Sequence, residues 1–248
     1  MKTNELIFSF PKMNSELLNF SKTSTKFLKK GNTSLEKLRI DLNIFKDSAK
    51  TEFIWEIPES SPIETILSEG KFETSGKGIP VYGSVCGIWE IKKVTYKGQL
   101  HFAVHGNASM KISIVHFDDA KGILDEIARW RFEIGSHDSP GCHFHAQIMG
   151  EKSDCMFPHD LSVPRLPSII ITPVDVLDYL LGELFQDNWH RLVSESSDQS
   201  VNQWSSIQKT RISNLIKWKS NIISSSDGSS WVAIKRAKPA AHIFVDLV

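Results

Sequence analysis

The sequence predicts an α+β fold, in which a central antiparallel sheet (a meander) packs against a long apolar helix, with helical segments at both ends of the chain. Three patterns carry this prediction. Residues 81–117 alternate apolar and polar side chains, as half-buried strands do. Residues 172–193 carry apolar side chains at helical spacing. Residues 12–50 and 201–223 show helical spacing with a more polar composition.

Composition and charge argue against several classes of protein. Lys plus Arg and Asp plus Glu both total 29, so the formal net charge is zero and no overall field favours nucleic acid or an anionic membrane. Three cysteines without a CxxC pair, Cys86, Cys142 and Cys155, argue against the disulfide framework of a secreted protein. The N-terminus lacks the apolar run of a signal peptide, and no stretch approaches the roughly 20 apolar residues of a membrane-spanning helix. We therefore expect a cytoplasmic protein without a membrane segment.

Two helices are predicted in residues 12–50. The first has a lysine-rich face and is expected to end at Gly31, because glycine is frequent just beyond a helix. In the second, Thr33 and Glu36 have the spacing of a capping box, and an apolar stripe follows at Leu35, Leu38, Leu42 and Phe45. Residues 51–80 are rich in proline and glycine and are predicted to be a boundary or a long connection.

The sheet is predicted from successive strands. Residues 81–96, 99–106 and 109–117 read as strands, with turns at Lys97-Gly98 and Gly106-Asn107. A short helix is expected at residues 118–129, and strands are expected at 130–134 and 142–149.

The strongest helix prediction covers residues 172–193. Thr172 is a favourable N-cap, Pro173 suits the first helical position, and Asp175 lies in the first turn, where the helix dipole favours a negative charge. We expect this helix to cross the meander and close the core. Residues 231–248 are predicted to form one or two short strands separated by a proline.

The helix predicted at residues 201–223 presents Trp204, Arg211 and Trp218 on one side. Tryptophan and arginine are enriched at the centres of protein interfaces, so these three residues are candidates for binding a protein partner or a second copy of the chain. The alternative is that they complete the core.

The chain divides into three ranges by composition. Residues 1–70 form an N-terminal helical segment, 71–193 a sheet core with its covering helix, and 194–248 a C-terminal helix and strand. We expect the three to make one compact unit.

A histidine-rich stretch, residues 135–151, holds three of the nine histidines of the chain. If a strand begins at Cys142, alternation places His143, His145 and Gln147, an HxHxQ motif, on one face. The opposite face then carries core residues, namely Cys142, Phe144, Ala146 and Ile148.

The segment HFHAQIMG resembles the histidine-triad superfamily, in the branch of the galactose-phosphate uridylyltransferases and dinucleoside-polyphosphate phosphorylases. The resemblance implies that His145 attacks an α-phosphate and forms a covalent nucleotidyl intermediate. It also implies that His143 and Gln147 orient His145 and bind phosphate oxygens. Neutral imidazole is a suitable nucleophile when a neighbour fixes its tautomer. These three residues are therefore candidate catalytic residues of a phosphohydrolase or nucleotidyltransferase.

Two other interpretations of the histidines stay open. Imidazole and carboxylate ligands suit zinc or another divalent metal, so His137, His143 and His145 are candidate metal ligands. Alternatively, the histidines and Gln147 hydrogen-bond to neighbours on a partly covered sheet face and have no further role.

A larger block, His143 to Trp189, is similar to uncharacterised prokaryotic proteins in which a His-bearing strand precedes a proline-rich loop and an apolar helix that begins with Thr-Pro. Some of these proteins resemble members of defence or toxin–antitoxin gene clusters, which implies an antiviral setting. Within the VPRLP loop, Arg165 is a candidate contact for an anion or a partner, or a structural pair for a nearby carboxylate.

The sequence contains no complete signature of a known catalytic class. Glu90 and Lys92 form an E-x-K, a partial nuclease signature without a matching acidic pair, and the sequence contains neither a glycine-rich phosphate loop nor GxSxG or HExxH. The leading expectation is therefore a cytoplasmic interaction or regulatory subunit, in which a nucleotide or nucleic-acid partner has no support from net charge. The alternative is a histidine-dependent or metal-assisted enzyme centred on the HxHxQ strand.

Overall fold

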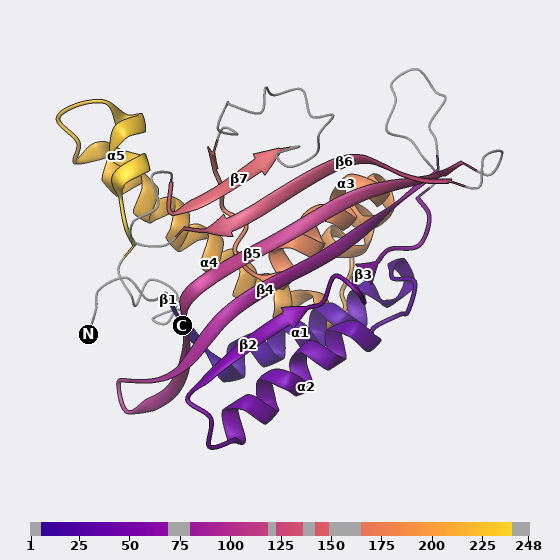
Figure 1. The fold of residues 1–248 in the computed structure, drawn as a ribbon, viewed down its shortest axis with the longest axis horizontal. Coiled ribbons are helices and arrows are strands. Elements are labelled where there is room, and N and C mark those ends of the chain that lie inside the picture. Colours follow the sequence, from indigo (N-terminus) through magenta and orange to yellow (C-terminus); the bar gives the residue numbers. More distant parts are fainter. Residues whose placement is uncertain (1–5, 69–79, 119–122, 136–141, 149–164, 240–248) are drawn as a thin grey trace.

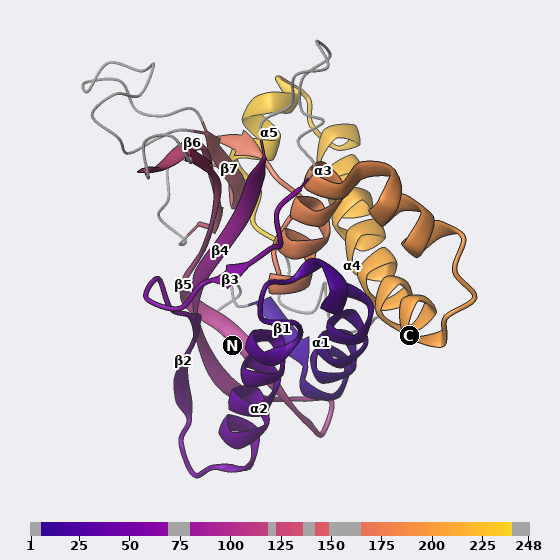
Figure 2. The same cartoon turned by 90° about the vertical axis from the view of Figure 1, so that its right-hand side faces the viewer.

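The computed structural model describes residues 6–68, 80–118, 123–135, 142–148 and 165–239. It confirms the α+β fold. An eight-stranded antiparallel sheet has the order β2-β4-β5-β6-β7-β8, with β1 paired to β5 and β3 paired to β4 (Figure 1). Helices α1 to α4 all lie on one side of this sheet, and in Figure 2 no helix of the described residues crosses the other side, which we call the helix-free face.

The elements have the following bounds. The strands are β1 Leu6–Ser9, β2 Glu52–Ile57, β3 Ile63–Glu64, β4 Val81–Tyr96, β5 Gln99–Asp118, β6 Ile123–Ile134, β7 Phe144–Ile148 and β8 Leu166–Pro167. The helices are α1 Phe10–Ser24, the 3-10 helix η1 Thr25–Phe27, α2 Thr33–Asp47, α3 Pro173–Ser194, α4 Gln199–Ser224 and α5 Ser230–Arg236.

The long hairpin β4–β5 confirms one predicted turn and corrects the other. Lys97 and Gly98 have φ values of 51° and 76°, the left-handed region that a tight hairpin turn requires. The turn predicted at Gly106-Asn107 is wrong, because both residues lie inside β5. A bulge occurs there, and a Cβ on Gly106 would lie 1.7 Å from Glu90 Oε2. This glycine therefore makes room for the Glu90 side chain.

Three further boundary predictions are corrected by strand pairing or helix formation. Residues 123–129, predicted as part of a helix, belong to β6, because pairing with β5 overrides the local pattern. The predicted connection at 51–80 contains β2, which pairs with β4 from Glu52 to Ile57, while 69–79 lie outside the described residues. Residues 231–236, expected to be extended, belong to α5.

The N-terminal helices keep their predicted core stripe but not their predicted ends. Leu35, Leu38, Leu42 and Phe45 are all buried, as predicted. Helix α1 ends at Ser24 instead of Gly31, which adopts φ +56° in the turn before α2. The predicted capping box of Thr33 and Glu36 does not form, because the N-cap is Asn32 and Glu36 pairs with Arg39 at 2.8 Å.

Helix α3 closes the core as predicted. The Thr172 hydroxyl accepts a hydrogen bond from the Asp175 backbone, and the Asp175 carboxylate accepts one from the Thr172 backbone, which is a complete capping box. The helix packs closely on β4, since a Cβ on Gly83 would lie 2.7 Å from Leu180. The chain kinks at Gln186, where φ is 37° and ψ is −113°.

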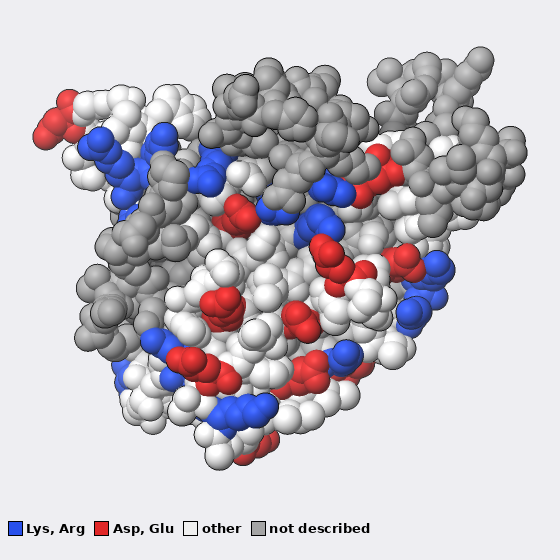
Figure 3. Space-filling model, in the orientation of Figure 1, with Lys and Arg blue, Asp and Glu red and all other residues white. Residues whose placement is uncertain are grey.

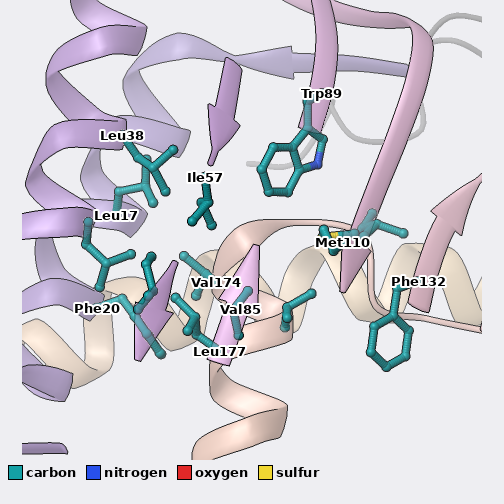
Figure 4. Packing of buried hydrophobic residues seen from close by; sticks show 14 of the residues in the cluster. Leu17, Phe20, Leu38, Ile57, Val85, Trp89, Met110, Phe132, Val174 and Leu177 are labelled. Carbon is teal, nitrogen blue, oxygen red and sulfur yellow. The ribbon is translucent and has the colours of Figure 1, made fainter. Parts of the chain in front are cut away.

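The hydrophobic core is one connected cluster. Figure 4 shows Leu17 and Leu38 from the N-terminal helices, Trp89 and Met110 from the sheet and Leu177 from α3 within it. Helix α4 contributes Leu215, so the cluster draws residues from all three ranges into which the sequence was divided. None of the described helices combines the length and apolar character that crossing a membrane requires.

Candidate functional site

The histidine-bearing strand β7 lies near one edge of the sheet, between β6 and β8. On the core side, Phe144 is buried against Trp218 of α4, with ring centroids 6.0 Å apart. Cys142 is also buried and Ala146 packs against the core, whereas Ile148 is exposed at the end of the strand. His145 stands directly opposite Glu133 of β6.

His145 is 2% exposed and hydrogen-bonded at both ring nitrogens. Nδ1 lies 2.8 Å from the Cys142 carbonyl oxygen, and Nε2 lies 2.9 Å from Glu133 Oε2. Both ring nitrogens therefore face oxygen atoms, a backbone carbonyl on one side and a carboxylate on the other. In this conformation neither nitrogen presents a free lone pair, which a nucleophile requires.

Glu133 completes the pair as an ionised carboxylate. The hydrogen bond from His145 holds the pKa of Glu133 below its ordinary value, and the positive charges of Arg131 and Arg165 act in the same direction. The candidate Arg165 is exposed and lies close enough for its charge to act on Glu133. This position agrees with its interpretation as a structural partner of a carboxylate.

The remaining candidates of the HxHxQ motif have other neighbours than His145 has. The buried ring of His143 packs nearly perpendicular to Phe144, with centroids 4.8 Å apart, and Gln147 stands opposite Arg131. His137 lies outside the described residues. In the part of the chain that the structure describes, no group of three or more His, Cys, Asp or Glu side chains is arranged to hold a metal ion.

The aromatic and basic candidates of α4 lie in the interior. Trp204 is buried, and its Nε1 donates to Thr23 Oγ1 of α1 at 3.2 Å, while Trp218 is partly buried against the core. Arg211 is 3% exposed. The structure thus places this stripe among the packed helices, which agrees with the alternative that its residues complete the core.

Arg211 joins three helices through a buried cluster of charges. Its guanidinium donates to both oxygens of Glu16 in α1, at 2.8 Å and 2.7 Å, and from Nε to Asp175 in α3 at 3.2 Å. Burial raises the pKa of the Glu16 carboxyl, and the charge of Arg211 opposes that increase. Nearby, burial also raises the pKa of Asp178, which accepts hydrogen bonds from Trp189 and Gln208.

The helix-free face of the sheet contains a depression that sequence reasoning missed. Figure 3 shows this face, where acidic and basic side chains lie as separate spots among uncharged ones. The depression, which we call the Lys111 pocket, has a volume of about 270 Å³. Its lining includes Ile57, Pro58, Glu59, Ile88, Lys111 and Arg131. Lys111 and Arg131 meet through the β5–β6 register, so no local sequence pattern marks the site.

The second feature missed by sequence reasoning is the exposed helix α5. None of its residues is buried, and Trp231 is 71% exposed. The other six tryptophans are buried or partly buried, so Trp231 differs from all of them. Lys235 and Arg236 follow at four-residue spacing from Trp231 and Val232 and are also exposed. The alternation of the sequence suggested strands here, which concealed this surface.

Comparisons with protein families, with curated proteins and with solved structures find no match for this chain. The contacts described above are therefore the basis for assigning a function.

The His145–Glu133 pair gives a test of its own. We expect Glu133→Gln to lower the free energy of unfolding at pH 7 by about 1.5–3 kcal/mol, because the substitution removes a charge-assisted hydrogen bond to a buried ring. The pKa of Glu133 is depressed in the folded state, so its ionised form stabilises the fold above the ordinary pKa of 4.5. That contribution is lost as the pH falls through the folded-state pKa. Urea denaturation between pH 7 and pH 3 measures both effects.

Glu64→Gln is the matched control for this test. Glu64 forms a surface pair with Lys29 at 3.0 Å, and surface pairs contribute about 0–1 kcal/mol. Equal losses for the two variants, or a loss in Glu133→Gln that persists at pH 3, would contradict the pairing.

Proposed function

We propose that the protein is a non-catalytic interaction subunit that docks a protein partner through helix α5, with Trp231 as the central contact. The observation that carries this proposal is the 71% exposure of Trp231 on a helix that buries none of its own residues. An exposed aromatic side chain contributes little to the stability of a monomer, whereas tryptophan is among the residues that dominate the binding energy at interfaces.

The surroundings of Trp231 define the chemistry of the partner. Val232 is also exposed, and Lys235 and Arg236 lie on the same exposed side of the helix. In the preceding helix α4, Ile216 and Ile223 are exposed and, seven residues apart, lie on one side. The fitting partner therefore presents an apolar pocket for the indole ring with acidic side chains at its rim.

The cellular setting is part of the proposal. We propose a cytoplasmic subunit of a prokaryotic defence or toxin–antitoxin-like system, on the resemblance to proteins of such gene clusters that the sequence of the His143–Trp189 block suggests. No contact among the described residues favours the alternative of a histidine-dependent or metal-assisted phosphohydrolase or nucleotidyltransferase, because both ring nitrogens of His145 are already hydrogen-bonded.

Site-specific cross-linking tests the docking proposal. A photoreactive phenylalanine analogue at position 231 should cross-link one defined protein, and the same analogue at position 44 should not. Ile44 is a matched control because it is an apolar residue on a helix with 62% exposure. The partner identified by this cross-link, purified on its own, should then bind the wild type at least tenfold more tightly than it binds Trp231→Ala. A loss of affinity of this size is expected for a residue at the centre of an interface.

Two outcomes of these measurements would contradict the proposal. Equal affinity of the partner for Trp231→Ala and the wild type would remove Trp231 from the interface. Sedimentation showing a dimer that dissociates in Trp231→Ala would identify a second copy of the chain as the occupant, in place of a different protein.

A further inference from the structure

The Lys111 pocket lies on the helix-free face of the sheet, where the turn after β2 approaches β4, β5 and β6. Its volume of about 270 Å³ gives room for roughly nine water molecules, at about 30 Å³ each. This volume is just below the roughly 300 Å³ at which pockets for drug-sized ligands begin. The pocket therefore suits a small molecule.

Two cations meet in this pocket at an unfavourable register. Lys111 of β5 stands directly opposite Arg131 of β6, and like charges in this relation repel each other. Arg129 lies two residues before Arg131 on the same strand, and its positive charge acts on both Glu59 and Cys86. Glu126 and Glu133 offset part of this charge, since they lie 2.6 Å from Arg129 and 3.8 Å from Arg131, so Lys111 and Arg131 are the cations that line the pocket itself.

Glu59 supplies an anionic group from within the chain. Its carboxylate lies 2.7 Å from Lys111 Nζ, and this contact holds the pKa of Glu59 below its ordinary value. The Glu59 side chain is 76% exposed, and the residue belongs to a turn in which Ser61 N donates to the Pro58 carbonyl. An exposed ion pair of this kind is weak, so an incoming anion displaces Glu59 at little cost.

The rest of the pocket fits an apolar body attached to the anion. Pro58 and Ile88 provide apolar wall, and Ser109, which also lines the pocket, adds a polar group. The negative charge of Glu56 at the same pocket disfavours a second anionic group on the ligand.

From this geometry we propose that the Lys111 pocket binds a small molecule with one carboxylate or phosphate group, held between Lys111 and Arg131 in place of the Glu59 carboxylate. This binding is independent of the docking surface on α5. Carboxylate and phosphate share the oxygen acceptors that lysine and arginine recognise, and the two ligand types are separated by experiment.

Methyl NMR of isoleucine-labelled protein tests the site directly. Butyrate, a monocarboxylate, and inorganic phosphate are titrated separately at low ionic strength, and the methyl resonances of Ile88 report binding. At least one anion should shift them saturably. Glu59→Ala should lower the apparent Kd at least threefold, because the competing carboxylate is gone. Lys111→Gln should raise it at least tenfold.

Lys92→Gln provides the matched control, since Lys92 lies on the same face of β4 outside the pocket and should change the Kd less than twofold. Binding of phosphate alone identifies a phosphate ligand, and binding of butyrate alone identifies a carboxylate; either result supports the shared site. Absence of a saturable shift with both anions, no gain in Glu59→Ala, or equal losses in Lys92→Gln and Lys111→Gln would overturn it. Unchanged methyl dispersion verifies that each variant is folded.

Discussion

Replacement of Arg211 by methionine should lower the free energy of unfolding by about 3–5 kcal/mol, because it leaves the buried carboxylates of Glu16 and Asp175 without their cation. Domains have total stabilities of about 5–15 kcal/mol, so this loss is a large fraction of the whole. Urea denaturation monitored by tryptophan fluorescence measures it. Lys209→Met, an exposed position on the same helix, should cost less than about 0.5 kcal/mol.

The effect of Arg211→Met should also depend on pH. Burial already raises the pKa of Glu16 above its ordinary value of 4.5, and removing the opposing charge of Arg211 raises it further. A raised carboxyl pKa contributes stability that is fully present below 4.5 and is lost as the pH rises through the folded-state pKa. The difference in the free energy of unfolding between the wild type and Arg211→Met should therefore become smaller as the pH falls from 7 to 4.5. A constant deficit over this range would show that Glu16 is not the group left uncompensated.

Trp204→Ala should have an effect of similar size, about 3–5 kcal/mol, since it removes a large buried aromatic side chain. The Trp204 ring lies 5.1 Å from Phe20 and 6.4 Å from Trp189, between centroids, and its Nε1 donates to Thr23. The variant thus loses ring packing and leaves a cavity between α1, α3 and α4. Thermal and urea unfolding measure the loss.

Trp231→Ala is the natural comparison, because it makes the same substitution at a position 71% exposed. It should change the free energy of unfolding by no more than about 0.5 kcal/mol. The free energy of unfolding would then depend on Trp204, and the affinity for the partner would depend on Trp231. Comparable unfolding losses in both variants would contradict the packing described for α4 and α5.

The sequence predicted the fold best where the signal is local. The stripe of α2 and the N-cap at Thr172 depend on residues within a few positions of each other, and both are observed. The two segments predicted on either side of Gly106 are one strand, and residues 123–129 are extended, because strand pairing decides both. The strand with which a segment pairs, and the register of that pairing, cannot be read from the local pattern of either segment.

The candidate sites show the same division. Strand alternation correctly places Phe144 in the core, but the partner of His145 depends on the register between β6 and β7. The helical spacing of Trp204 and Arg211 is visible in the sequence, whereas their burial against α1 is decided by tertiary packing. Lys111 and Arg131 likewise meet only because β5 and β6 pair.

The Arg211 cluster bears on how the protein is made. Glu16 and Arg211 are separated by 195 positions, so the carboxylate leaves the ribosome long before its cation has been synthesised. At translation rates of about 5–20 residues per second, Glu16 waits on the order of ten seconds or more. During that interval α1 has neither Arg211 nor Trp204 to pack against, so the side of α1 that faces α4 stays uncovered. We therefore expect ribosome-bound chains that stop before α4 to remain sensitive to protease, and chains that extend past α4 to become resistant.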